Sequence, residues 1–152
     1  MINRLAHAAV LVGDYDEAIQ WYTESLGLEL RADTVYGQDY RWLTVGVPGQ
    51  DGIDLVLHRA CTDGTQILPP FGKQPAFVLF TDDCFKETEI LRQRGVRVTR
   101  DPSMVLWGIE SILEDPYGNL FALVQPCGIP PRNVARTTSP HGETLKLLRR
   151  NL

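Results

Sequence analysis

Four side chains with acid, base or metal-binding chemistry stand in otherwise apolar sequence: His7 in LAHAAV, Asp54 and His58 in GIDLVLH, and Glu110 in VLWGIESIL. Imidazole and carboxylate groups transfer protons near neutral pH and also ligate divalent metals. Burying an unpaired carboxylate costs several kcal/mol, so each acid has either a function or a partner inside the fold. For Asp54, a partner such as His7 or Arg41 is the structural alternative.

Strand alternation predicts which of these side chains share a face. Successive side chains on a strand point to opposite sides, and the more uniformly apolar set should cover the helices. The set predicted to face a cavity comprises Tyr40, Trp42, Thr44, Asp54, Val56, His58 and Glu110. The set predicted to pack against the second helix comprises Val105, Trp107, Ile109 and Leu113. Aromatic residues on such a wall, including Phe80, either fill volume or stack on a flat or apolar ligand.

Two helices position these strands, and they are related by a repeat. The segment from Asp14 to Gly27 carries an apolar stripe at helical spacing, an acidic N-cap and a glycine stop, and Tyr15, Ile19, Tyr22 and Leu26 form the stripe. The segment from Asp82 to Gly95 begins and ends in the same way, 68 residues later, with Phe85, Ile90 and Leu91 as its expected stripe. Two homologous modules are therefore indicated.

Each module is expected to read as a strand, a helix and three further strands, which predicts an α+β fold of two βαβββ modules in tandem. The expected elements are residues 3–12, 14–26, 28–33, 40–47 and 53–59, then 75–81, 83–94, 96–100, 104–114 and 119–125. Residues 1–126 are predicted to be one domain, with module one at 1–60, a linker at 61–74 and module two at 75–126. Residues 127–152 form a C-terminal extension in which Leu145, Leu148 and Leu152 share one face, so that either a short docking helix or a frayed terminus is expected.

The segments LAHAAVLVGDYDEAIQWYTESLGLEL and EDPYGNLFALVQP carry a family resemblance. They resemble the opening helix and the closing DP-x-GN turn and strand of glyoxalases and bleomycin-resistance proteins, which belong to the vicinal-oxygen-chelate superfamily. The resemblance covers roughly residues 3–126. It implies paired βαβββ modules forming a curved mixed sheet around a cavity, commonly a homodimer, and often a divalent metal.

The resemblance also implies four metal-ligand positions, on the first and last strand of each module. In this sequence they are His7, Asp54, Ala76 and Ala122. Alanine has no donor atom, whereas a catalytic zinc site usually has three protein ligands. We therefore expect no metal cofactor. The alternative is a site for Zn, Ni, Mn or Fe built on His7 and Asp54.

Three functions follow from the resemblance. The first is an enzyme in which Glu110, His7 or Asp54 transfers a proton. The second is a protein that binds a small apolar or aromatic metabolite or drug without a metal, using Tyr40, Trp42, Asp54, His58 and Phe80. The third, disfavoured by the alanines, is a metal-dependent lyase, isomerase or dioxygenase of the same superfamily. The residues favour small-molecule binding and leave catalysis open.

Composition limits the domain class, the partners and the cellular compartment that the sequence allows. The chain has 152 residues, 43% hydrophobic and 22% charged, which is typical of one globular domain. Its net charge of −4 argues against nucleic acid as a partner, and no apolar stretch is long enough to span a membrane. The three cysteines are an odd number without paired spacing, so we expect reduced thiols and a cytoplasmic protein.

Overall fold

The structure, a computed structural model, describes residues 1–37, 40–60 and 74–127. Nearly all of the predicted linker, and the predicted docking helix in the extension, lie outside the described residues. Within the described part, no helix is long and apolar enough to cross a membrane.

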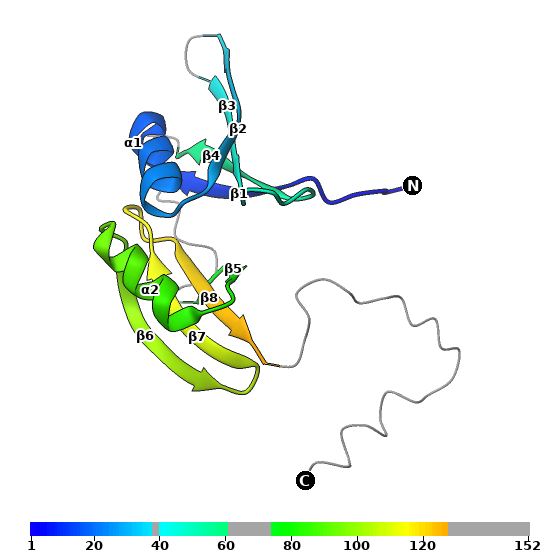
Figure 1. The fold of residues 1–152 in the computed structure, drawn as a ribbon. Coiled ribbons are helices and arrows are strands. Elements are labelled where there is room, and N and C mark those ends of the chain that lie inside the picture. The colour runs from blue at the N-terminus through cyan, green and yellow to red at the C-terminus, as the bar shows by residue number, and fades with distance from the viewer. Residues whose placement is uncertain (38–39, 61–73, 128–152) are drawn as a thin grey trace.

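The first half of the chain forms one βαβββ module (Figure 1). Its strands make a four-stranded sheet in the order β1-β4-β3-β2, with β1 and β4 parallel and the other neighbours antiparallel. Its elements are β1 (His7–Val12), α1 (Tyr15–Gln20), the π-helical turn η1 (Trp21–Ser25), β2 (Glu29–Tyr36), β3 (Tyr40–Gly46) and β4 (Asp54–Arg59).

The second half repeats this topology. Its sheet has the order β5-β8-β7-β6, again with the first and last strands of the module parallel. Its elements are β5 (Phe77–Phe80), α2 (Cys84–Gln93), β6 (Arg97–Val105), β7 (Gly108–Glu114) and β8 (Leu120–Pro126). The α+β class and the tandem βαβββ modules predicted from the sequence are confirmed.

The two helices begin at acidic caps and end at glycines, as predicted, with one difference. Asp14 caps α1 by accepting hydrogen bonds from the backbone N–H groups of Asp16 and Glu17, both at 2.9 Å. In module two the cap is Asp83, which accepts from Lys86 N at 3.0 Å, and the predicted Asp82 was wrong by one residue. The interval between equivalent residues is therefore 69 at the helix caps and 68 at the glycine stops.

The additional residue in module one is taken up by η1. There the backbone N–H of Leu26 bonds to Trp21 O at 3.0 Å, five residues back rather than four. A π-helical turn of this kind accommodates one inserted residue without ending the helix.

The same one-residue difference explains a wrong prediction about α2. The predicted stripe of α1 lies on the core, but α2 buries Cys84, Thr88 and Leu91 and leaves Phe85 exposed. One residue turns an α-helix by about 100°, so the shifted cap turns Cys84 inward in place of Phe85. The Cys84 thiol contacts Leu123 O at 3.5 Å, and burial raises its pKa, as expected for a structural thiol.

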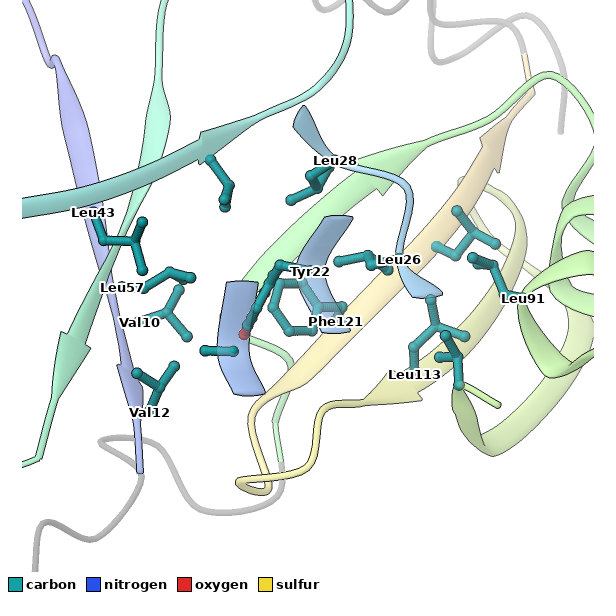
Figure 2. Close-up of a cluster of buried hydrophobic side chains, with 14 of the residues drawn as sticks. Val10, Val12, Tyr22, Leu26, Leu28, Leu43, Leu57, Leu91, Leu113 and Phe121 are labelled. Carbon is teal, nitrogen blue, oxygen red and sulfur yellow. The ribbon is translucent and has the colours of Figure 1, made fainter. Parts of the chain in front are cut away.

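One hydrophobic core joins both modules. Figure 2 shows Tyr22 of η1 against Phe121 of β8, with Val10 and Leu57 on one side and Leu113 on the other. The rings of Tyr22 and Phe121 have centroids 6.0 Å apart and meet edge to face. The helix-facing side of each sheet is therefore covered within the chain.

A polar network ties the DP-x-GN turn to module one. Asp115 is 4% exposed, and its Oδ1 accepts from the backbone N–H groups of Tyr117 and Asn119. Its Oδ2 accepts from the Tyr22 hydroxyl at 2.6 Å and from Asn119 Nδ2 at 2.7 Å. Asn119 Nδ2 also donates to Leu11 O at 2.8 Å. Burial, followed by the adjacent Asp115 charge, raises the pKa of Tyr22 far above its usual range.

The hairpin between β6 and β7 replaces the single strand predicted over residues 104–114. The chain reverses at Leu106 and Trp107, where Val105 pairs with Gly108. Gly108 has a φ of 148°, and a Cβ at this position would lie 2.1 Å from the carbonyl oxygen of Gln125. Only glycine allows this close approach to β8, so the sequence Trp107-Gly108 marks a turn rather than the middle of a strand.

Candidate functional site

The face of module one that lies away from the helices carries the predicted site residues. Leu43, Val45 and Leu57 are buried in the shared core. Because side chains alternate along a strand, the other face of β3 and β4 carries the remaining residues. These are Tyr40, Trp42, Thr44, Asp54, Val56 and His58, as predicted from the sequence.

His7 and Trp42 meet across this face. Their rings are 5.2 Å apart and nearly perpendicular, although they come from β1 and β3, which are separated by β4. Val56 lies on the same face of the intervening strand and is only 4% exposed. The contact between the two rings therefore forms an aromatic cover over the middle of the sheet.

A second group of rings extends this surface toward the β2–β3 end. Tyr36 and Tyr40 have centroids 6.1 Å apart, and Tyr40 and His58 are 6.3 Å apart, with tilted planes in both pairs. Tyr36 and Tyr40 are exposed, so their surfaces are available for contact with another flat group. We refer to His7, Trp42, Tyr36, Tyr40 and His58 together as the aromatic wall.

Asp54 stands beside His7 at the end of the aromatic wall, because these two residues are register partners in the parallel pair β1–β4. Its ion-pair partner is Arg31, whose Nε lies 4.0 Å from Asp54 Oδ1. Arg41, one of the two partners considered from the sequence, instead binds Asp33 with two hydrogen bonds. Of these two, His7 is the one that lies next to Asp54.

Arg31 was not predicted, and a β-bulge brings it to Asp54. The register of β2 shifts next to Arg31, and its Nη2 donates to Val47 O and Gln50 O at 3.0 and 2.9 Å. A Cβ on Gly46 would lie 2.7 Å from Asp54 Oδ1 and 2.8 Å from Arg31 Nε. The missing side chain of Gly46 thus leaves the space in which the acid and the guanidinium meet.

Glu110 lies on the corresponding face of module two, as predicted, and it is a partnered acid. Its carboxylate binds Arg100 Nη2 through one oxygen and accepts from Trp107 Nε1 at 3.0 Å through the other. Trp107 was predicted to pack against the second helix, and that prediction was wrong. Trp107 sits in the β6–β7 turn and is half exposed, because the turn moves it off the strand.

Phe80, the remaining predicted ligand-binding residue, is exposed on this face of module two. It is the register partner of Val124, and the neighbouring Val78 pairs with Ala122. Ile112, Ala122 and Val124 form a small buried apolar cluster on the same face. The site residues predicted from sequence therefore fall on two surfaces: the aromatic wall with Asp54 in module one, and Glu110 with Phe80 in module two.

The donors present do not fit a complete metal site. His7 and Asp54 are adjacent, but the module-two positions matched to them by sequence are Ala76 and Ala122, and the register partner of Ala122 is Val78; none of these side chains has a donor atom. Among residues 1–37, 40–60 and 74–127, no group of three or more His, Cys, Asp or Glu side chains is placed to hold an ion. Two protein donors are fewer than a catalytic zinc site uses, so no chemical step is assigned to a metal.

A cavity of about 520 Å³ lies at the junction of the modules. Residues 9–13, which span the end of β1, form one wall, and Ala60, Ala76 and Phe77 line it together with Tyr117 and Asn119. None of the predicted site residues lines this cavity, so it is separate from the aromatic wall and from the Glu110 face.

Sequence comparison relates this chain to one protein family and to several individual proteins. A family model described as the Glyoxalase/Bleomycin resistance protein/Dioxygenase superfamily matches residues 4–123. An uncharacterised protein of Shewanella frigidimarina is 35% identical over 128 residues, which cover 82% of this chain and 95% of that protein. A probable chloroplastic lactoylglutathione lyase of Arabidopsis thaliana is 31% identical, and the match covers 81% of this chain but 36% of the lyase.

Among solved structures, TnmS3, described as an antibiotic binding protein from Streptomyces sp. CB03234, has a TM-score of 0.69 and 33% identity. The match covers 83% of this chain and 98% of TnmS3. The shared fold therefore includes nearly all of that protein.

Proposed function

The chain belongs to the glyoxalase/bleomycin resistance protein/dioxygenase superfamily, and from that premise we propose that it binds a small apolar or aromatic metabolite or drug without using a metal. The observation that carries this proposal is the aromatic wall, in which His7 and Trp42 meet over β4 and Tyr40 and His58 extend the surface. Exposed rings on a rigid sheet provide apolar contact area at low conformational cost. The likeness to TnmS3, described as an antibiotic-binding protein, supports the same function.

Removal of divalent metals tests the metal-free part of this proposal. We expect the protein, after dialysis against a chelator, to bind an aromatic ligand with the same affinity as protein supplemented with Zn, Ni, Mn or Fe. The reason is that Ala76 and Ala122 supply no donors in module two to complete a site with His7 and Asp54. Titration calorimetry measures the affinity, and elemental analysis measures the metal content. A stoichiometric metal whose removal abolishes binding would contradict the proposal.

Such a result would favour a second function, that of a metal-dependent lyase, isomerase or dioxygenase using His7 and Asp54. The observation in favour of this second function is the 31% sequence identity to a probable lactoylglutathione lyase. At least one further donor would then have to come from residues outside the described part of the chain or from a second copy. Catalysis without a metal, with His7 and Glu110 as proton-transfer groups, stays a prediction. Turnover that survives loss of both side chains would refute these assignments.

We also propose that the protein is a homodimer in the cytoplasm, in which the second copy covers the site faces of the first. Apolar side chains are exposed on both site faces, among them Tyr40 in module one and Val78 and Phe80 in module two. Cys84 and Cys127 are free thiols, which suits a reducing compartment. Light scattering should give a mass near twice the 17.1 kDa of one chain. A monomer at working concentrations, with ligand bound, would refute the dimer.

A further inference from the structure

The site face of module two has an apolar floor with a charged end. One row across the sheet runs from Val78 on β5 through Ala122 on β8 and Ile112 on β7 to Arg100 on β6, since each is the register partner of the next. Neighbouring strands lie about 4.8 Å apart, so the row spans roughly 14 Å. That length matches a ligand of two or three fused rings.

Three successive contacts hold the charged end of this row in place. The Arg100 side chain is 51% exposed, whereas Glu110, to which its Nη2 binds, is 10% exposed. The other oxygen of Glu110 accepts from Trp107 Nε1, so the acid is itself fixed. Trp107 in turn is tied to the sheet, because its carbonyl oxygen accepts from Cys127 N at 3.0 Å. The chain of contacts from Trp107 to Glu110 to Arg100 positions a guanidinium beside an apolar surface.

This arrangement has the features of an anion recognition site. A guanidinium carries five N–H donors in a planar fork that suits a carboxylate, and the contact with Glu110 engages one nitrogen of the fork. A side chain already held in one geometry loses little entropy on binding. The chain as a whole has a net charge of −4, so a local cation is needed to admit an anionic group.

Resting on the proposed small-molecule binding and homodimer, we propose that the ligand lies between the aromatic wall and the site face of module two, and that it is an aromatic or apolar carboxylate whose anionic end binds Arg100. Its ring body reaches the exposed side chains of Val78 and Phe80 at the other end of the row, beyond the buried floor of Ile112, Ala122 and Val124. In binding, Glu110 then acts as a positioning residue that orients Arg100. Arg100 is thus the residue that recognises the anionic group, and the ligand belongs to the class of aromatic or apolar carboxylates.

A matched pair of compounds tests the proposal. Titration calorimetry on the full-length protein would compare 2-naphthoate with the uncharged naphthalene-2-carboxamide, which has the same ring system. We expect wild type to bind the carboxylate about tenfold more tightly or better, because an ionised acceptor strengthens the hydrogen bonds. Arg100→Gln should remove this preference and leave the affinity for the amide nearly unchanged. Arg100→Lys should keep part of it.

Glu110→Gln tests the positioning role. The glutamine amide keeps an acceptor for Trp107 but loses its charge, so the preference for the carboxylate should fall between those of wild type and Arg100→Gln. The matched control is Arg97→Gln on the same strand, which makes the same charge change at a residue paired with Glu114. It should keep the full preference.

The outcomes distinguish the role of Arg100 from the proposed function. Equal affinity of wild type for both compounds, or a preference that persists in Arg100→Gln, would overturn the role of Arg100 alone. Failure of wild type to bind these compounds and a wider panel of aromatic molecules would overturn the proposed function. Thermal melting of each variant shows whether it is folded, and Arg100→Lys replaces Arg100→Gln if the latter is not.

Discussion

Replacing Asp115 with alanine should lower the free energy of unfolding by about 3–4 kcal/mol, the largest stability effect we expect from one substitution outside the apolar core. The buried carboxylate accepts four hydrogen bonds, two within its own turn, one from Asn119 Nδ2 and one from the Tyr22 hydroxyl of module one. Its loss leaves the buried Tyr22 hydroxyl without this acceptor. Urea denaturation followed by circular dichroism measures the change.

Two further variants provide reference values for the loss of unfolding free energy in Asp115→Ala. Tyr22→Phe removes one of the four hydrogen bonds, so we expect a loss of about 1–2 kcal/mol. Asp82→Ala removes an exposed acid, with an expected change within about 0.5 kcal/mol. We propose that residues 1–126 unfold as one unit, because the core and this network span both modules. Two separate transitions, or equal effects of Asp115→Ala and Asp82→Ala, would contradict this account.

Replacing Trp42 with alanine should weaken binding of a planar aromatic ligand about 10- to 100-fold, as expected for loss of one stacking surface. Trp42 meets His7 across β4, so its removal takes away the centre of the aromatic wall and uncovers Val56. Calorimetry with the compound that binds wild type best measures the loss. Trp42→Phe, which keeps a smaller ring, should recover part of the affinity.

Phe85→Ala provides the matched control for Trp42. Phe85 is an exposed aromatic residue on α2, and α2 covers the opposite side of the module-two sheet. Its removal should leave the affinity unchanged. If Trp42→Ala binds as well as Phe85→Ala, the aromatic wall is not the binding surface.

Much of the fold was predictable because it depends on local patterns. The cap at Asp14, the apolar stripe of α1 and the alternation along β3 and β4 are properties of neighbouring residues, and all three are present. The repeat extended these patterns to module two and placed Glu110 on the face opposite α2. Alternation also put Trp42, Asp54 and His58 on one face.

The features that the sequence did not predict depend on irregular backbone geometry and on pairing between distant segments. Arg31 reaches Asp54 because of a β-bulge, and hydrophobic periodicity does not report a bulge. Trp107 leaves the predicted strand because Gly108 must fit against β8, a contact between segments about 17 residues apart. The salt bridge that positions Arg100 depends on the same hairpin. These features require knowledge of which strands are neighbours.

The π-helical turn at Trp21–Ser25 marks a place where a duplicated fold can change length between its strands. An additional residue inside β1 would have reversed every side chain after it and turned His7 away from Asp54. Placed in the helix instead, the same insertion adds no residue to any strand and keeps His7 beside Asp54. A variant that lacks one residue of this turn should therefore have a regular α-helical turn in place of the π-helical one and keep the pairing of β1 with β4.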